Sequence, residues 1–263
     1  MMKLLALDID DTLIGTGKLP TERLKRAVRL AEDNGVKVVL ATGRGFLGSK
    51  AIRESLSLFG PIINYGGAVV SDGKSGERLL EHFLRPDDVI SAVAIADAFS
   101  IHVQIYEGDT VVFREENMFT KQYTGMLHLP FIVDPDLVFR PLDCIPKVLY
   151  AVDPKREADL YRDIRALLPE HLSVLTSKPG FIEIGSIRST KGSALKWLAA
   201  ELKIDRKDVT AIGDNTLDLD MIEWAGTGVC VENGNSLVKE KADLVIGSCD
   251  DDGVAAYLES VFA

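Results

Sequence analysis

The sequence predicts an α/β protein: a Rossmann-like doubly wound parallel sheet interrupted by an inserted α+β domain. Two observations support this prediction. Short apolar runs alternate with amphipathic helical segments over 1–84, and the same alternation returns over 187–263. The stretch 85–186 instead mixes helices with pairs of strands. We therefore expect a discontinuous core domain made of the two outer parts, with the middle part inserted between them.

The first elements of the core follow from apolar periodicity. Residues 4–7 (LLAL) form an unbroken apolar run, which is typical of a strand buried on both faces. A helix is expected over 21–35, with Thr21 as its N-cap and Gly35 just beyond its end. The next three elements continue the alternation: a strand over 36–41, a helix over 45–59 and a strand over 61–64. Together they predict β-α-β-α-β, the pattern of a parallel sheet.

The middle of the chain has a different pattern of predicted elements. Turn-forming residues at Asp72–Gly76 and Glu107–Asp109 each separate two strand-like runs, so two hairpins are expected. Further strands are expected in KVLYAVD, LSVLTS and FIEIGS. After them the core pattern resumes with a helix in STKGSALKWLAAEL, strands in DVTAIGD, AGTGVCV and ADLVI, and a closing helix in GVAAYLESVF.

Composition and charge exclude several classes of protein. The 263 residues are 46% hydrophobic, which is enough to bury a sizeable core. The formal net charge is −10, which argues against nucleic-acid or anionic-membrane partners, because those need a basic face. A small anionic substrate is still compatible with this charge, because one bound metal ion can reverse the local field.

The three cysteines are far apart and the four histidines lack ligand spacing, so neither a disulfide framework nor a zinc site is expected. The start of the chain shows no signal-peptide pattern, and no apolar run is long enough to span a bilayer. We expect a cytoplasmic protein with reduced thiols, present as a monomer or weak homodimer.

Polar residues gather where the predicted core strands end. The first strand runs into Asp8, the second into Thr42-Gly43-Arg44, and a later one into Gly213-Asp214. Because ligands of open parallel sheets bind beyond the carboxyl ends of the strands, these three segments should converge. Converging carboxylates suit a hard cation such as Mg²⁺, which also prefers a substrate phosphate.

Side-chain alternation adds a detail to the first segment. In an extended chain, Asp8 and Asp10 would point the same way and Asp11 the other way. Two parallel carboxylates, a metal ion and a lysine would suit phosphoryl transfer, with one acid attacking phosphorus and the other carrying the proton.

The chain is identified on these motifs as resembling the haloacid dehalogenase (HAD) superfamily, and more narrowly its Cof-type sugar-phosphatase branch, type IIB. DIDDTL matches the DxDxT motif, LATGR the second motif, STKGSAL the lysine motif, and IGDNTLDLDM the GDxxxD motif. The resemblance covers essentially the whole chain, and four motifs in order, each at the end of a predicted element, are far more specific than any one of them.

The resemblance implies a role for each matching position. Asp8 is expected to be the nucleophile that forms an aspartyl-phosphate, and Asp10 the acid and then the base. The metal ligands are expected to be Asp8, Asp214 and, through its backbone carbonyl, Asp10. The positions expected at the substrate phosphate are Thr42, Gly43, Lys191 and Asp11, although the Asp11 side chain should point away. Supporting contacts are expected from Thr12, Asn215 and Asp218, the last of which would orient Lys191 or a metal-bound water.

Three positions depart from the family pattern. Asp11 stands where glycine is commoner, Leu217 where the fourth motif usually has asparagine, and Gly66 where the branch usually has asparagine in an NGA stretch. Asn215 and Asn64 are the candidates to compensate for Leu217 and Gly66. These changes bear on efficiency and substrate choice more than on the class of reaction.

Each motif also has an ordinary structural interpretation. Asp8 and Asp10 could end a strand in a solvated turn, and Thr42-Gly43 could be a plain turn. Lys191 could be an exposed lysine in the first turn of a helix, although a cation there opposes the helix dipole. Asp214 and Asp218 could be surface acids.

The resemblance implies a Mg²⁺-dependent phosphoric monoester hydrolase acting on a small phosphorylated metabolite, such as a sugar phosphate. Two alternatives keep the same site: a phosphomutase that transfers the phosphoryl group to a sugar, and a pseudo-enzyme that binds a phosphorylated ligand. A receiver-like phospho-acceptor module would have neither Asp10 nor the insert. The inserted domain is expected to act as a cap that closes over the strand ends and selects the substrate.

Overall fold

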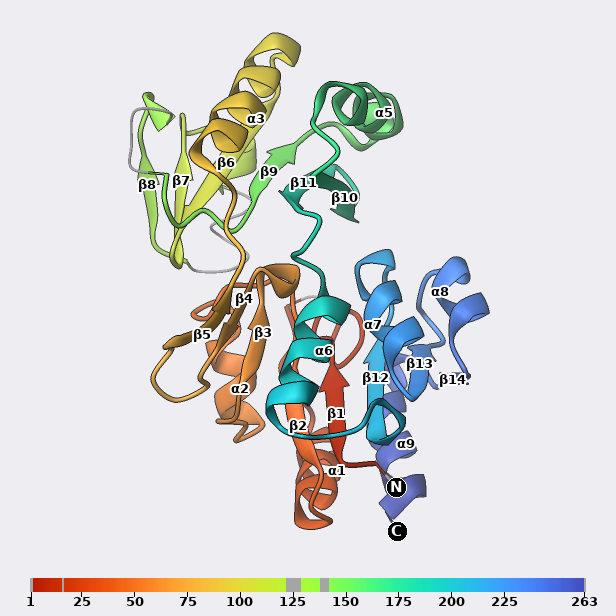
Figure 1. Ribbon diagram of the computed structural model, residues 1–263. Helices are drawn as coiled ribbons and strands as arrows, with labels where there is room; N and C mark the ends of the chain where they lie inside the picture. Colours follow the sequence, from red (N-terminus) through yellow and green to blue (C-terminus); the bar gives the residue numbers. More distant parts are fainter. Residues whose placement is uncertain (1, 16, 122–128, 138–141, 263) are drawn as a thin grey trace. The chain divides into compact units, whose positions relative to one another are not determined.

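A computed structural model describes residues 2–15, 17–121, 129–137 and 142–262 (Figure 1). The chain forms two compact units: Met1–Leu80 with Thr190–Ala263, and Glu81–Ser189. Each unit has its own hydrophobic core, and each is described by itself. The assignment of 1–84 with 187–263 as a catalytic core, and of 85–186 as a cap, stays a prediction.

The first unit is built on a five-stranded sheet in the order β14-β13-β12-β1-β2, in which every neighbouring pair is parallel. Its strands are β1 (Leu4–Leu7), β2 (Lys37–Leu40), β12 (Val209–Gly213), β13 (Thr227–Val231) and β14 (Leu244–Ile246). The central strand β1 is fully buried because it has a neighbour on each side and helices on both faces.

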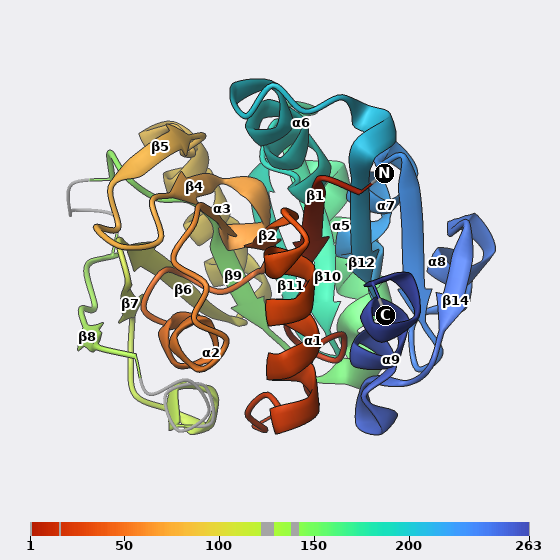
Figure 2. The same ribbon diagram turned by 90° about the horizontal axis from the view of Figure 1, so that it is seen from below.

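Helices cover both faces of this sheet, as Figure 2 shows for α6 on one side and α1 and α9 on the other. One face packs against α1 (Glu22–Asp33), α2 (Lys50–Ser55) and α9 (Gly253–Phe262). The other packs against α6 (Lys191–Glu201), α7 (Leu219–Trp224) and α8 (Ser236–Lys241). Alternate residues of each strand face opposite layers, so Leu5 and Leu7 join one core while Leu4 and Ala6 join the other. The predicted fold class is therefore confirmed.

Helix α1 illustrates how local chemistry sets the bounds of an element. The Thr21 hydroxyl accepts a hydrogen bond from the Leu24 amide, and Gly35 follows the helix with φ +80°. Leu24, Ala27 and Val28 recur on one face and are buried against the sheet.

Two predicted elements differ from the structure. The helix expected over 45–59 begins only at Lys50, because Gly48 lies in the turn just before it, and it ends before Ser57, which has φ +58°. The third strand, β3 (Ile62–Asn64), touches the parallel sheet through a single bridge from Ile63 to Ala41. It instead pairs antiparallel with β4 (Val69–Ser71), which is followed in the same small sheet by β5 (Arg78–Glu81). The connection between β3 and β4 is short, so the chain reverses there and the two strands pair antiparallel.

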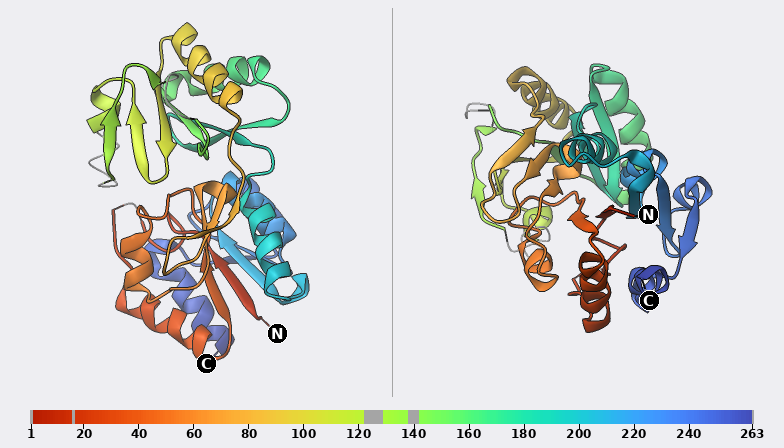
Figure 3. Two further views of the ribbon diagram at one scale, coloured as in Figure 1. Left: turned by 60° about the vertical axis from the view of Figure 1, so that its left-hand side comes forward. Right: turned by 60° about the horizontal axis from the view of Figure 1, so that its bottom comes forward.

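The second unit is an α+β unit with a six-stranded sheet in the order β10-β11-β9-β6-β7-β8. Its elements are α3 (Pro86–Phe99), β6 (His102–Glu107), β7 (Thr110–Phe113), β8 (Phe131–Val133), β9 (Val148–Ala151), α5 (Glu157–Leu167), β10 (Leu172–Lys178) and β11 (Phe181–Ser186). Both helices pack against the same face of the sheet, which Figure 3 allows the reader to follow. The predicted turn at Glu107–Asp109 closes the β6–β7 hairpin, with Gly108 at φ +58°.

Candidate active site

The strand register brings the predicted strand-end residues together. Leu7 lies beside Ile212 on β12 and Leu40 on β2, so the residues after these three strands emerge at one edge of the sheet. The Asp8 amide continues the ladder by donating to the Ile212 carbonyl at 3.0 Å. Asp8, Thr42 and Asp214 follow these strands within two residues.

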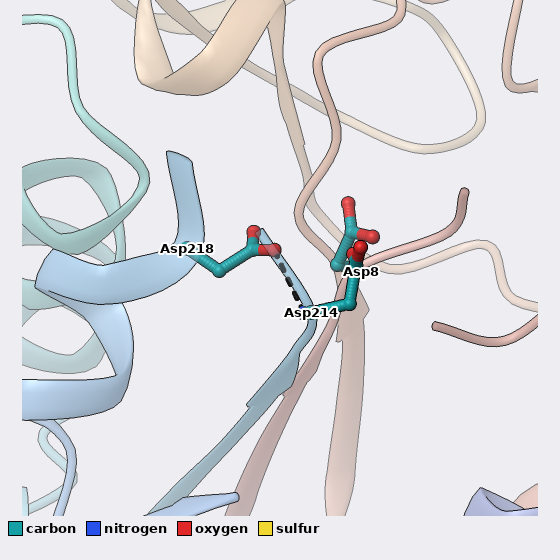
Figure 4. A group of neighbouring side chains, drawn as sticks. All are labelled: Asp8, Asp214 and Asp218. Atoms are coloured by element: carbon teal, nitrogen blue, oxygen red, sulfur yellow. Dashed lines mark hydrogen bonds between the residues drawn. The ribbon is translucent and has the colours of Figure 1, made fainter. Parts of the chain in front are cut away.

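Three carboxylates converge at this edge. Asp8, Asp214 and Asp218 each offer an oxygen, and these oxygens lie within 4.8 Å of one another. Figure 4 shows Asp8 and Asp214 projecting from the ends of two strands and Asp218 reaching toward them from the segment that follows β12. Asp8 is 5% exposed and Asp218 is fully buried. Acids this close and this buried require positive charge nearby.

Lys191 supplies part of that charge. Its Nζ donates to Asp8 Oδ1 at 2.6 Å and to Asp218 Oδ1 at 2.5 Å, and the residue is only 3% exposed. Lys191 is the first residue of α6, where the Thr190 side chain accepts from the Ser193 amide in a capping box. The surface-lysine interpretation therefore does not hold.

The start of α6 is also held by close packing. A Cβ added at Gly67 would lie 2.1 Å from the Thr190 carbonyl oxygen, and one added at Gly192 would lie 2.6 Å from an Asp220 carboxylate oxygen. The Gly192 amide donates to that same Asp220 oxygen at 3.0 Å. Glycine at these two positions permits the approach that fixes the backbone at Lys191.

The balance of charge shifts the pKa values of the cluster. Burial raises the pKa of Asp8 well above its ordinary value, with Asp218 and Asp214 adding to the rise and Lys191 opposing it. Burial and then Asp218 raise the pKa of Asp214 to about 6. Burial alone would lower the pKa of Lys191, but Asp218 and Asp8 outweigh it and raise the pKa. One ammonium facing three carboxylates leaves an excess of negative charge.

The residues predicted to support the site lie around this cluster. Asp218 Oδ2 accepts from the amides of Asp214 and Asn215 at 3.1 and 3.0 Å, so both of its oxygens are engaged. The Thr12 hydroxyl donates to Asp214 Oδ1 at 3.0 Å. Asn215 Oδ1 accepts from the Thr216 hydroxyl and from the Leu217 amide, which is a local capping arrangement.

The positions predicted to bind phosphate are only partly together. Thr42 is fully buried, and its hydroxyl accepts from the Arg44 amide at 3.1 Å. Gly43 follows Thr42. A Cβ added at Gly43 would meet open space, since no atom outside its two chain neighbours would lie within 4 Å of it. Asp11 lies in a turn with φ +60°, and its carbonyl accepts from the Asn233 side chain.

The extended conformation assumed for the first motif ends at Asp11. The chain turns at Asp11, and the amides of Leu13 and Ile14 both donate to the Ile9 carbonyl. The Asp10 carboxylate is not a member of the described acidic cluster. It is instead held by Arg44, a residue that the motif analysis placed at a strand end but gave no role. Only the position of Arg44 in the turn after β2 could have signalled this contact.

The donor set suits a hard divalent cation. Oxygen ligands from Asp8 and Asp214, with an uncompensated negative charge, are what Mg²⁺ prefers. The geometric cluster includes Asp218, whereas the sequence assigned the third position to the Asp10 carbonyl. Since both oxygens of Asp218 already accept hydrogen bonds, we favour Asp218 as a holder of Lys191.

Comparison with known proteins identifies the family. A family model described as haloacid dehalogenase-like hydrolase matches residues 5–258. The chain belongs to this family. It is 31% identical to "Putative phosphatase YxeH" of Bacillus subtilis, over 97% of this chain and 96% of that one. The predicted superfamily and branch are thus confirmed, as is the predicted enzyme class, a HAD-type phosphatase.

Two further similarities extend over the whole chain. It is 30% identical to the 5-amino-6-(5-phospho-D-ribitylamino)uracil phosphatase YcsE of B. subtilis, over 97% of this chain and 93% of the relative. A crystal structure of a haloacid dehalogenase-like hydrolase from Bacteroides thetaiotaomicron superposes with a TM-score of 0.89 at 26% identity, covering all of both chains. Across the described residues, none of the helices combines the length and the apolar character that a membrane crossing requires.

Proposed function

We propose that this protein is a Mg²⁺-dependent phosphatase that hydrolyses a small phosphomonoester through an aspartyl-phosphate on Asp8. The observation that carries the proposal is the buried cluster of Asp8, Asp214 and Asp218 around Lys191 at the ends of parallel strands. Phosphoryl transfer depends mainly on positioning and on neutralising charge, and this cluster is arranged for both.

The first step joins an oxygen of Asp8 to phosphorus and breaks the bond from phosphorus to the ester oxygen. Asp10 gives its proton to the departing alcohol. In the second step water attacks the same phosphorus, Asp10 takes the proton from that water, and the Asp8 carboxylate is released with inorganic phosphate. The balance of atoms is one water consumed and one alcohol and one phosphate formed.

The neighbouring side chains make Asp8 competent to attack an anion. Lys191 donates to Asp8 and places a positive charge where the phosphoryl oxygens would lie. When Mg²⁺ is bound, Asp8, Asp214 and the Asp10 carbonyl would hold it, and it would neutralise charge on the phosphoryl group. Thr42 and Gly43 would contact the phosphoryl oxygens.

The substrate class is proposed from the relatives. The name of YcsE describes a substrate whose phosphate is carried on a ribityl chain, and a ribityl chain is a polyol. We therefore expect a phosphate carried on a sugar or polyol carbon, selected by the inserted unit acting as a cap. A cytoplasmic location and a monomeric or weakly dimeric state stay predictions.

The test is phosphate release from sugar phosphates, polyol phosphates, nucleotides, pyridoxal phosphate and p-nitrophenyl phosphate, with Mg²⁺ or with excess EDTA. We expect turnover that EDTA abolishes and that Asp8→Asn lowers by at least about 10³-fold. Asp33→Asn is the matched control, because Asp33 is an exposed acid at the end of α1 in the same unit.

Each other result would be informative. Phosphate release that persists in Asp8→Asn would contradict the aspartyl-phosphate. Appearance of an isomeric sugar phosphate without free phosphate would replace hydrolysis by a phosphomutase reaction. Tight binding of a phosphate ester with no turnover would indicate a binding protein.

A further inference from the structure

Arg44 holds the carboxylate of Asp10 in a two-pronged ion pair. Its Nε donates to Asp10 Oδ2 at 2.9 Å and its Nη2 to Asp10 Oδ1 at 2.8 Å. The third guanidinium nitrogen, Nη1, donates to the Gly48 carbonyl at 3.0 Å. A planar fork that bonds both oxygens fixes the plane of a carboxylate, which a single ammonium contact does not.

The backbone of Arg44 is itself fixed to the ends of two strands. Its amide donates to the Thr42 hydroxyl at 3.1 Å. Its carbonyl accepts from the Tyr65 amide at 3.0 Å and from the side chain of Asn64, a fully buried residue at the end of β3. The fork therefore projects from a rigid part of the unit onto the turn that contains Asp10.

The pair is only partly shielded, with 17% of the Arg44 side chain and 23% of the Asp10 side chain exposed. A bidentate pair that is mostly buried can stabilise the turn as well as fix the carboxylate, and the experiment below separates these two effects. Each carboxylate oxygen has two acceptor positions, and the fork occupies one on each. The fork therefore restricts the directions in which the carboxylate can carry a proton.

We propose that Arg44 is a positioning residue that sets the orientation from which Asp10 gives and takes its proton. This proposal rests on the proposed function, because it assumes that Asp10 is the proton carrier. The contact through which Arg44 would act is its two-pronged ion pair with the Asp10 carboxylate.

The experiment compares two substrates whose leaving groups differ. An alkyl phosphate, such as a sugar phosphate, needs a proton on its departing oxygen, whereas p-nitrophenyl phosphate does not. The value of kcat/KM covers only the steps up to departure of the alcohol. We expect Arg44→Met to lower kcat/KM for the alkyl ester about 10- to 100-fold and for the aryl ester less than about 3-fold. Arg44→Lys keeps the positive charge but loses the two-pronged contact, so its kcat/KM for the alkyl ester should lie between the values of the wild type and Arg44→Met.

A double-mutant cycle makes the test specific to Asp10. In the Asp10→Asn background, Arg44→Met should lower kcat/KM for the alkyl ester by no more than about 3-fold further. Equal losses for both substrates, or a full further loss in the Asp10→Asn background, would overturn the proposal. Failure of the proposed function would be seen separately, as wild-type phosphate release that is absent or independent of Asp8, and it would overturn both.

Discussion

Each unit of this protein buries a lysine against acidic side chains, and the two arrangements differ in one respect. In the second unit, Lys147 Nζ lies 2.8 Å from Glu183 Oε2, and these side chains are 7% and 16% exposed. One cation meets one anion, and the charges cancel. In the first unit, Lys191 faces Asp8 and Asp218, with Asp214 beside them, so three carboxylates meet one ammonium.

The difference separates a structural ion pair from a site. Removing charges from water is expensive, and a pair recovers the cost only when its charges and hydrogen bonds are complete. The Lys147–Glu183 pair matches one positive charge with one negative charge. The cluster around Lys191 does not, and the raised pKa values of Asp8 and Asp214 are the consequence. A cation binding there would complete the charge, which is why the unbalanced cluster is the candidate active site.

The largest expected effect comes from removing each lysine. Lys191→Met leaves three carboxylates without the ammonium that faces them. We therefore expect turnover to fall at least about 10²-fold and the free energy of unfolding in EDTA to fall by about 3–5 kcal/mol. Lys147→Met leaves only the Glu183 carboxylate without its ammonium partner, and it should lower the free energy of unfolding by about 1–3 kcal/mol. Chemical denaturation with and without Mg²⁺, together with phosphate release, measures these quantities.

The response to Mg²⁺ distinguishes the two lysines. Stabilisation by Mg²⁺ should increase in Lys191→Met, because the cluster then carries more negative charge, and should match the wild type in Lys147→Met. If Mg²⁺ stabilised both variants equally, the two buried clusters would not differ in the way proposed here.

A smaller effect is expected from loosening the backbone that carries Lys191. Gly67 has φ +102°, and a Cβ there would overlap the Thr190 carbonyl oxygen, so Gly67→Ala should lower the free energy of unfolding by about 2–4 kcal/mol. Its neighbour Gly66 is the matched control. Gly66 has φ +64° with open space around an added Cβ, so Gly66→Ala should cost only about 1 kcal/mol.

Gly66→Asn should cost less than Gly66→Ala, because asparagine tolerates the left-handed conformation. This variant introduces the residue that the resemblance described in the sequence analysis implies for this position. Urea midpoints of the three variants give the comparison. Equal losses for Gly66→Ala and Gly67→Ala would mean that the approach of Gly67 to α6 is not a constraint.

Much of this arrangement could be predicted from the sequence. An apolar run that ends in a carboxylate identified β1 and Asp8 together, and the same pattern identified β12 and Asp214. The carboxyl ends of neighbouring parallel strands share one edge, so the convergence of these residues follows from topology alone.

The parts that could not be predicted depend on turns and on side-chain choice. The contact of Arg44 with Asp10 lies next to the turn at Asp11, whose φ of +60° an aspartate permits but does not specify. The pairing of β3 with β4 was decided by a short connection rather than by the apolar pattern that both strands share. The resemblance left open whether Asp218 orients Lys191 or a metal-bound water. The preference for Lys191 rests on the two backbone amides and one ammonium that donate to the Asp218 carboxylate.

The acidic cluster around Lys191 should also make stability depend on pH. The pKa of Asp214 is raised to about 6 in the folded protein, so its ionised form is disfavoured by folding. In metal-free protein its contribution to stability is therefore greatest below about pH 4, decreases as the pH rises to about 6, and is constant above that. The total change should be on the order of 3 kcal/mol.

Asp214→Asn isolates this contribution, because asparagine does not titrate. Urea unfolding in EDTA between pH 4 and pH 8 should give a difference between wild type and Asp214→Asn that moves against the wild type as the pH rises to about 6. Mg²⁺ requires the ionised carboxylate, so its stabilisation of the wild type should increase over the same range and be weaker in the variant. A difference between the two proteins that is independent of pH would show that Asp214 is already compensated, and the contrast with the Lys147–Glu183 pair would then rest on Asp8 alone.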